Sequence, residues 1–366
     1  MSDGSQSLGG GETFGDVGIL GYGRFGRALG ELLSEAGIRH RAFDPAVDVP
    51  PEFRTASLEE LTRGAEFVVV VVPVSHMKAA LVALRPHVGS HQIVLDVGSV
   101  KVGPAAALDA VCGTEIPWCA THPLFGPVSL AMAERPLRVV VCPAAAHPMA
   151  AARVRALYQG IGCEVIEQSP DNHDRVMAHT HALTFFIAKG MIDAGAGMDV
   201  PFAPPSFQAF ARTIDSVRSD AGHLFSAIAR ENPFAAQARK ELVAALTAID
   251  KALDETPTLG EAVLASETTK FAIPDLGTQS PELKEVRDLV DAIDRDIVQT
   301  LARRVQLAHR AARAKANLGA PVLDAAREAG MMAARGAWAI DAKLDPDAVR
   351  DVFRAIITMS RRVQKT

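Results

Sequence analysis

The sequence is poor in cysteine, in aromatic residues and in long apolar runs, and each shortage excludes a class of protein. Its 366 residues include four cysteines without a CxxC pair or a neighbouring group of histidines, so neither a disulfide scaffold nor a metal site is expected. The longest apolar run, 67–74, is far shorter than the roughly 20 residues that cross a bilayer. Residues 1–15 lack the basic start and apolar segment of an export signal and are predicted to form a flexible tail. We therefore expect a cytoplasmic protein with no membrane span.

The charge pattern argues against a nucleic-acid-binding protein. The net charge is −5, but residues 281–366 carry +4 and the rest of the chain −9, which indicates two separate units. In the basic part, acidic residues interleave with basic ones, and Trp338 and Phe353 are its only aromatic residues. This pattern offers neither a row of cations for phosphates nor a stacking surface for bases.

The order of apolar runs predicts three folded domains. Residues 16–145 alternate short β-branched runs with helix-like segments, which is typical of an α/β domain with a parallel sheet covered by helices on both faces. Residues 146–255 lose these runs and are predicted to form a mainly helical second domain. Scattered Pro, Gly, Ser and Thr over 256–280 indicate a linker. Residues 281–366 form the third domain, which is predicted to be all-helical.

This last domain has clear signals for the ends of its helices. Ser280 is a candidate N-cap, and Gly319 is the next strong stop, which together predict one helix of nearly forty residues. Further helices are predicted from near Asp324 and from the Asp-Pro-Asp sequence at 345–347. A helix of this length does not fit a compact monomer, and we expect an intertwined homodimer.

The sequence GYGRFG at 21–26 lies between an apolar strand and a helix. Its three glycines allow a tight turn and the close approach of a pyrophosphate to the helix N-terminus. About twenty residues later, a carboxylate ends the next strand, where it can accept ribose hydroxyls and repel a 2′-phosphate. We predict NAD as the cofactor, although the nearby Arg41 leaves NADP open. The predicted cofactor-binding residues are Gly21, Gly23, Arg24, Phe25, Gly26 and Asp44.

A second group of polar residues follows the later strands of the same predicted sheet. His122, in THPLFGP, comes directly after a strand, at the edge where loops reach the nicotinamide in such sheets. Ser99 and Lys101, in DVGSVK, lie in the preceding strand-end loop and can converge on the same place.

The motifs GYGRFG, DVGSVK, HPLFGP and NHDRVMA, in this order and spacing, resemble the prephenate dehydrogenase family over about residues 16–255. The resemblance implies NAD-dependent oxidative decarboxylation of prephenate to 4-hydroxyphenylpyruvate, on a nucleotide-binding domain followed by a helical dimerisation domain. It also implies that His122 accepts a hydrogen bond, and then the proton, from the ring hydroxyl, while Ser99 helps to position it. Lys101 and His173 are predicted to contact the substrate.

The second domain departs from this family at two positions. Phe185 stands where a further histidine is usual, and Gln208 stands where an arginine for the ring carboxylate is usual, with Arg212 as a candidate substitute. Arogenate and 4-amino-4-deoxyprephenate therefore remain alternative substrates. His179 and His181 are additional candidates, although residues two apart on a helix do not share a face.

The helical tail contains polar residues at helical spacing. Arg304 and Lys315 fall within roughly 20° of each other around a helix, whereas Arg287 points about 100° away and would serve a partner chain. Asp324, Arg327 and Glu328 follow i, i+3, i+4 spacing, and Ser360 with Gln364 form an i, i+4 pair. The spacing fits a solvated charged face as well as an inward cluster that binds a small dianion.

The tail as a whole resembles the all-helical class of chorismate mutase over roughly 281–366. The resemblance implies that Arg304 and Lys315 hold substrate carboxylates within the subunit, and that Arg287 reaches across a dimer. Lys315 and Gln364 would face the ether oxygen of the breaking bond, Asp324 and Glu328 would approach the ring hydroxyl, and Arg327 and Ser360 would complete the wall. We therefore expect a bifunctional enzyme that converts chorismate to prephenate and oxidises prephenate. In the alternative, the tail is a regulatory module that senses an aromatic end product.

Overall fold

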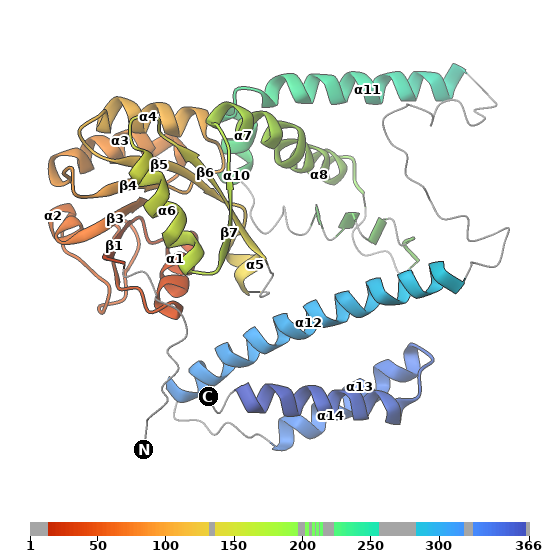
Figure 1. Cartoon of the computed structure of the whole chain (residues 1–366). Helices are drawn as coiled ribbons and strands as arrows, with labels where there is room; N and C mark the ends of the chain where they lie inside the picture. Colours follow the sequence, from red (N-terminus) through yellow and green to blue (C-terminus); the bar gives the residue numbers. More distant parts are fainter. Residues whose placement is uncertain are drawn as a thin grey trace, which may run out of the picture. The chain divides into compact units, whose positions relative to one another are not determined.

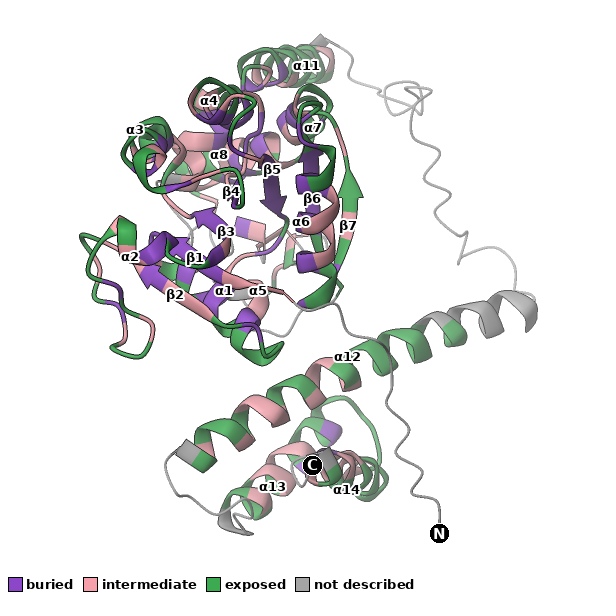
Figure 2. Ribbon diagram, turned by 60° about the vertical axis from the view of Figure 1, so that its left-hand side comes forward, coloured by how far each residue is buried: buried purple, intermediate pink, exposed green. Residues whose placement is uncertain are grey.

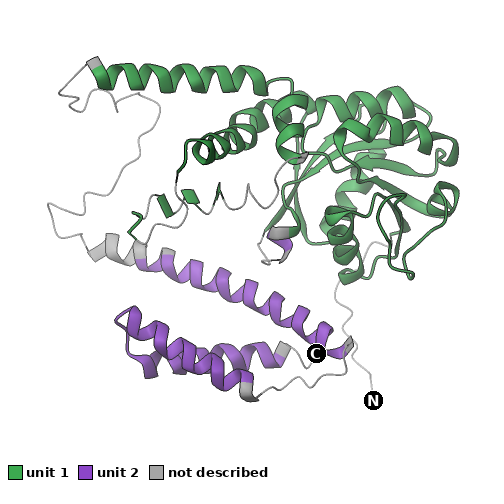
Figure 3. Ribbon diagram, turned by 180° about the vertical axis from the view of Figure 1, so that it is seen from behind, with its two compact units in different colours: residues 1–127, 136–266 green, residues 128–135, 267–366 purple. Residues whose placement is uncertain are grey.

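The computed structural model describes residues 14–131, 136–196, 202–204, 207–208, 210–211, 213–214, 223–255, 283–317 and 325–363. The chain divides into two compact units, residues 1–127 with 136–266 and residues 128–135 with 267–366 (Figure 3). The first unit contains a sheet and helices, and the second is helical (Figure 1). This division agrees with the change of charge near residue 280.

A seven-stranded sheet in the order β2-β1-β3-β4-β5-β6-β7 forms the centre of the first unit. Strands β1 to β5 are parallel, which confirms the predicted α/β class. The strands are β1 Asp16–Leu20, β2 His40–Phe43, β3 Ala65–Val70, β4 Ile93–Asp96, β5 Trp118–Pro123, β6 Leu137–Pro143 and β7 Cys163–Glu167.

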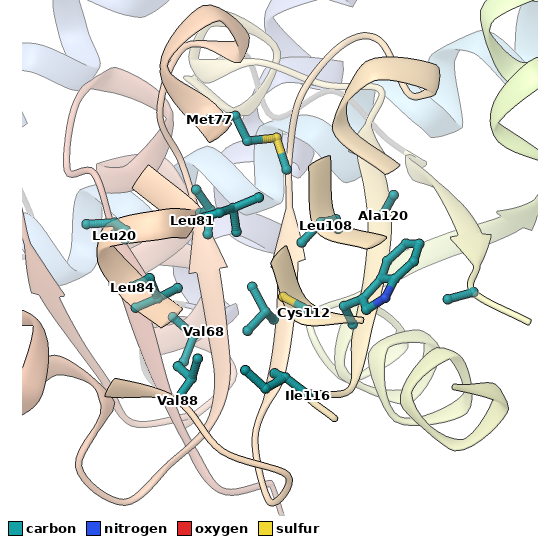
Figure 4. Close-up of a cluster of buried hydrophobic side chains, with 14 of the residues drawn as sticks. Leu20, Val68, Met77, Leu81, Leu84, Val88, Leu108, Cys112, Ile116 and Ala120 are labelled. Atoms are coloured by element: carbon teal, nitrogen blue, oxygen red, sulfur yellow. The ribbon is translucent and has the colours of Figure 1, made fainter. Parts of the chain in front are cut away.

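Helices cover both faces of this sheet, with α3 and α4 side by side on one face (Figure 1). The helices around the sheet are α1 Arg24–Glu35, α2 Leu58–Thr62, α3 Val74–Leu84, α4 Val102–Cys112 and α6 Pro148–Gly160, with a 3₁₀ turn at Arg85–His87, and the short helix α5 Pro127–Ala131 follows β5 in the chain. The buried residues of α3 are Met77, Leu81 and Leu84, spaced so that they lie on one face of the helix. They meet Leu108 and Cys112 of α4 above strands β3 to β5, as Figure 4 shows.

Two features of the sheet differ from the prediction. β6 runs antiparallel to β5, so the end of β5 and the start of β6 lie at the same edge of the sheet and no crossover helix is needed between them. Residues 163–167, CEVIE, add a seventh strand, so the sheet extends past the predicted domain boundary at 145. This edge strand is short and most of it is exposed, so it has no continuous apolar run by which the sequence could reveal it.

After the sheet, the first unit is helical, as predicted for most of 146–255. Its elements are α7 Pro170–Met177, a π-helical turn at Ala178–Ala182, α8 Leu183–Asp193, α10 His223–Ser226, a second π-helical turn at Ala227–Glu231, and α11 Ala235–Glu255. Phe185 and Ala188 of α8 pack against Ile214 and Ile228 in a small separate core. The predicted linker, 256–280, and the predicted N-cap Ser280 lie outside the described residues.

The second unit contains the three predicted helices: α12 Leu283–Asn317, α13 Ala325–Asp341 and α14 Pro346–Val363. The 35 residues of α12 confirm the long first helix. Asp345 caps α14, since its Oδ1 accepts the backbone N–H of Asp347 at 2.9 Å. Figure 2 shows that most of the described surface of α12 is exposed or half-buried.

Candidate active sites

The glycine-rich loop lies between β1 and α1, and its glycines meet different spatial limits. Gly21 has φ +100°, and a Cβ on it would lie 2.3 Å from the carbonyl oxygen of Val71. A Cβ on Gly26 would lie 2.3 Å from the carbonyl oxygen of Gly21, so only glycine lets α1 pack this closely. A Cβ on Gly23 would meet no atom within 4 Å. The backbone at the start of α1 is therefore open, as the approach of a pyrophosphate requires.

The Asp44 carboxylate, at the end of β2, is held by backbone N–H groups. Its Oδ2 accepts from Tyr22 at 2.7 Å, and its Oδ1 accepts from Ala46 and Val47 at 2.8 and 3.0 Å. A carboxylate offers about four lone-pair positions, so Oδ2 keeps acceptor capacity for a ribose hydroxyl. The residues of this loop thus fit a dinucleotide with unmodified ribose.

Two aromatic rings connect the glycine loop with the loop after β5. The ring centroids of Phe25 and Phe125 are 6.0 Å apart, which brings the motifs GYGRFG and HPLFGP to the same edge of the sheet. Arg24 is exposed beside them. Arg41, which left NADP open, donates to Asp16 at 2.9 Å and to the carbonyl of Glu60.

His122 is the second-last residue of β5, so it lies inside the strand and not directly after it as predicted, and it belongs to a chain of buried hydrogen bonds. Its Nδ1 is 2.8 Å from Nε2 of His173, and Nδ1 of His173 is 2.8 Å from Oδ1 of Asp174. The Asp174 carboxylate also accepts the backbone N–H groups of Lys101 and Val102 at 2.7 and 2.8 Å. Both ring nitrogens of His173 are therefore engaged, and its side chain is only 1% exposed. The predicted substrate contact of His173 is hard to reconcile with this position.

Lys101 is also buried below the predicted site. Its ammonium donates to Oδ2 of Asp96 and to the carbonyl of Thr121, and its side chain is fully buried. The Thr121 N–H in turn donates to Oδ1 of Asp96 at 3.0 Å. The ammonium thus holds the strand that carries His122, which favours a supporting role over the predicted contact with substrate.

The surroundings of His122 keep its imidazole neutral. Burial, followed by the nearby His173, Lys101 and His181, lowers the pKa of His122 well below its ordinary value. The His181 ring lies nearly parallel to it, with centroids 6.3 Å apart, and Phe185 meets the edge of His181 at 5.0 Å.

The two extra histidines take different positions, as their spacing predicts. The π-helical turn at 178–182 places His181 against His122, whereas His179 is exposed and lies 3.6 Å from Glu241. Single π-helical turns are frequent at functional sites. His181 thus belongs to the site, although the sequence did not distinguish it from His179.

For the remaining predicted residues of this site, the structure gives little beyond their exposure. Ser99 lies half-buried in the loop between β4 and α4. Gln208 is exposed and donates to the carbonyl of Ala203 at 2.9 Å. Arg212 lies outside the described residues.

In the second unit, polar residues of α12, α13 and α14 come together. The Arg304 guanidinium donates to the hydroxyl of Ser360 and, at 3.4 Å, to the carbonyl of Ile356. Burial, and then the neighbouring Arg335, lower the pKa of Arg304 from its ordinary very high value. Arg361 forms a two-point ion pair with Glu328. The structure thus gives contacts for three of the predicted residues in two separate pairs, Arg304 with Ser360 and Glu328 with Arg361, and Arg361 is an addition that the sequence did not suggest.

The other predicted residues of the tail are placed only in part. Lys315 lies half-buried in the last turn of α12, and Arg327 is exposed on α13. Arg287 lies in α12, but its side chain is not among those described, and Asp324 and Gln364 lie outside the described residues.

Across the described ranges, no group of three or more His, Cys, Asp or Glu side chains has the geometry of a metal site. No described helix is long and apolar enough to cross a membrane.

Two family models match the chain in separate regions. Residues 41–167 match the nucleotide-binding domain of prephenate dehydrogenase, and residues 286–365 match chorismate mutase type II. The first match extends through β7, in agreement with the seven-stranded sheet.

Curated relatives match different portions of the chain. The "Probable arogenate/prephenate dehydrogenase" of Methanocaldococcus jannaschii is 25% identical over 50% of this chain and 42% of its own length. The isochorismate pyruvate lyase of Pseudomonas aeruginosa is 39% identical over 20% of this chain and 73% of its own length. The 4-amino-4-deoxychorismate mutase of Streptomyces venezuelae is 31% identical over 24% of this chain and 84% of its own length. The chain therefore spans less than half of the Methanocaldococcus protein but most of the two short enzymes.

The fold is also that of a solved structure. The prephenate dehydrogenase of Aquifex aeolicus, in complex with hydroxyphenyl propionate and NAD+, has a TM-score of 0.51 and 20% identity. The similarity covers 78% of this chain and 99% of the Aquifex chain.

Proposed function

Because the chain joins a prephenate dehydrogenase nucleotide-binding domain to a type II chorismate mutase domain, we propose that it is a bifunctional enzyme of tyrosine biosynthesis. The second unit rearranges chorismate to prephenate. The first unit then oxidises prephenate to 4-hydroxyphenylpyruvate with NAD. Both activities act on one metabolite, which gives a physical reason for their union in one chain.

In the first unit, the buried imidazole is the group that handles the proton. NAD, when bound by the open glycine loop and Asp44, supplies the acceptor for the hydride that leaves the ring. Loss of CO2 makes the ring aromatic, so the protein need only polarise the ring hydroxyl and align the reacting groups. His122 accepts the hydrogen bond and then the proton of that hydroxyl through Nε2, and Ser99 helps to position it.

In the second unit, fixed positive charge performs the catalysis. The rearrangement is unimolecular and needs no proton transfer, so a rate increase comes from holding a compact conformer and stabilising negative charge on the ether oxygen. Arg304, whose direction is set by Ser360, holds a carboxylate, and Lys315 and Gln364 approach the ether oxygen. Asp324, Arg327 and Glu328 line the same pocket, and Arg287 reaches it from a second chain.

The position of His122 is the observation that carries this proposal. It is a neutral, buried imidazole at the end of β5, and the contact between Phe25 and Phe125 brings its loop to the dinucleotide loop. The direct test supplies chorismate and NAD to pure protein and follows NADH together with the aromatic product. Formation of both is expected. No NADH and no loss of chorismate would contradict the proposal, and a tail that acted only as a sensor would leave chorismate unchanged.

A related substrate is the second candidate, because the chain spans 84% of a 4-amino-4-deoxychorismate mutase. Phe185 and Gln208 stand at the two positions that differ from the usual prephenate dehydrogenase pattern. Steady-state rates with prephenate, arogenate and 4-amino-4-deoxyprephenate distinguish these activities. Our first choice is wrong if prephenate is the poorest of the three. Isochorismate belongs in the mutase assay, since the lyase of Pseudomonas aeruginosa is also similar.

We also propose that the protein is a homodimer. Exposed apolar residues form one row on α11 and a second row on α12. Contact of such rows with water is unfavourable, and a second chain would cover them. These residues are Val243, Leu246, Ile249 and Leu253 on α11 and Val290, Ile293, Ile297 and Val298 on α12. Light scattering of the purified chain tests this.

Four free buried cysteines, together with the use of NAD, favour the cytoplasm as the location of the protein.

Replacement of Asp44 by alanine is expected to weaken NAD binding by about 10- to 100-fold, since a hydrogen bond to a charged group contributes roughly 1.5–3 kcal/mol. The preference for NAD over NADP is also expected to fall, because the carboxylate no longer repels a 2′-phosphate. Calorimetric titration with both nucleotides measures the effect. D48A is the matched control, because Asp48 lies in the same loop with a side chain 88% exposed. Equal losses in the two variants would argue against a ribose contact.

The pH profile follows from the burial of His122. The neutral imidazole is the active form, and its pKa is lowered, so the acid limb of kcat/KM is expected well below pH 6.5, the ordinary pKa of histidine. Dehydrogenase rates from pH 5 to pH 9 test this, and an acid limb at or above 6.5 would contradict it.

The same shift in the pKa of His122 also affects stability. At acidic pH the histidine of the unfolded chain binds a proton more readily than the buried His122 of the folded chain. The free energy of unfolding that His122 contributes is therefore present above about pH 6.5 and is lost as the pH falls below that value.

A further inference from the structure

The hydrogen bonds around His122 have a defined direction that begins at Asp174. The carboxylate of Asp174 is an acceptor only, and it lies at the N-terminus of α4, where it accepts the N–H groups of Lys101 and Val102. The positive end of this helix stabilises negative charge on the carboxylate. Asn232, which is buried, donates to the backbone carbonyl of Asp174 at 2.8 Å and holds the residue in place.

An acceptor at one end determines the donor at each later position. Nδ1 of His173 lies 2.8 Å from Asp174 and must carry a proton, because the carboxylate cannot donate. In a neutral ring, Nε2 of His173 is then an acceptor. Its partner at 2.8 Å, Nδ1 of His122, must be the donor. The remaining nitrogen of His122, Nε2, therefore has an unshared electron pair.

The order of donors requires a His173 ring with one proton, and both of its nitrogens already face protein partners. The ring is 1% exposed, and the buried Lys101 ammonium is close enough to lower the pKa of His122. A doubly protonated His173 would donate from both nitrogens and reverse the hydrogen bond to His122.

We propose that Asp174 and His173 are positioning residues that hold His122 in the tautomer protonated at Nδ1, so that Nε2 is always ready to accept a proton. The assignment rests on the proposed function of the first unit, and it changes the role of His173 from a substrate contact to a support for His122. It also gives the helical region a part in the chemistry, because α7 contributes the two residues that orient an imidazole of the sheet domain.

Two substitutions with opposite expected effects test the order of the hydrogen bonds. In D174N, an amide nitrogen in the place of Oδ1 donates toward His173 and reverses the tautomers of both rings, and it loses the hydrogen bond that Oδ1 accepts from the Lys101 N–H. The expected kcat for oxidation falls by about 100-fold, the low end of what a correctly protonated base contributes. In H173Q, the amide oxygen can still accept from His122 while its nitrogen donates toward Asp174, so most of the activity is expected to remain. D171N is the matched control, since Asp171 lies on the same helix and is 61% exposed.

A spectroscopic measurement separates this proposal from the proposed function. Solid-state spectra of protein labelled with ¹⁵N in the histidine rings, assigned with H122N, report which nitrogen carries the proton without any substrate. The expected result is a His122 protonated at Nδ1 in the natural chain and in H173Q, and at Nε2 in D174N. A His122 protonated at Nε2 in the natural chain, a doubly protonated His173, or a folded D174N with full kcat would each overturn the assignment. Absence of dehydrogenase activity with the expected tautomer would instead reject the proposed function alone.

Discussion

Replacement of His122 by asparagine is expected to lower kcat for prephenate oxidation by about 10³- to 10⁴-fold, the upper part of the range that a general base contributes. Asparagine is the informative substitution because its amide nitrogen can keep the hydrogen bond to His173 while Nε2 is lost. The imidazole acts on the ring hydroxyl and not on the nucleotide. The affinity for NAD and the mutase rate are therefore expected to stay nearly unchanged.

Three measurements are needed for this variant: the stopped-flow or steady-state rate of NADH formation, the dissociation constant for NAD, and the consumption of chorismate. H179N is the matched control, because His179 lies on the same π-helical turn as His181 but is exposed. Equal loss of oxidation and mutase activity in H122N would contradict the separation of the two sites. A loss of NAD affinity as large as the loss of kcat would place His122 in nucleotide binding instead.

Replacement of Arg304 by alanine is expected to reduce the chorismate mutase rate by about 10²- to 10³-fold, the usual effect of removing one fixed donor that stabilises charge in a transition state. The guanidinium is half-buried and is already oriented by Ser360 and the carbonyl of Ile356. Oxidation of added prephenate depends on His122 and is expected to remain. Coupled production of NADH from chorismate is expected to fall with the mutase step.

The controls for Arg304 separate chemistry from folding. R354A removes an arginine that is 65% exposed on α14 and is expected to leave both activities intact. R304K keeps a positive charge but loses the two-point geometry of the guanidinium, so an intermediate rate is expected. Circular dichroism of each variant reports whether the helices persist. A folded R304A with full mutase activity would remove Arg304 from the catalytic group and would favour the sensor interpretation of the tail.

Local sequence patterns were sufficient to predict those structural features that depend on residues close together in the chain. Gly26 is determined by a clash within its own turn, because a Cβ there would meet the carbonyl of Gly21, and the helix ends of the tail are determined by capping residues such as Asp345. The resemblance to two enzyme families rested on short motifs of the same kind. The sequence did not predict strand β7 because most of its residues are exposed at an edge of the sheet, where no apolar run is needed.

The roles of individual polar residues depended on contacts between distant segments. Asp174 is 73 residues from Lys101, and His122 is 51 residues from His173, so no spacing rule relates them. The same holds for Arg361 and Glu328, which are 33 residues apart. The sequence therefore determined the two domain families and the main candidates for catalysis, because these follow from local backbone geometry and residue type. Only the tertiary structure decided which histidine faces His122, which cation is buried near it and which carboxylate orients it, because these are set by the packing of α4 against β5 and of α7 against α4.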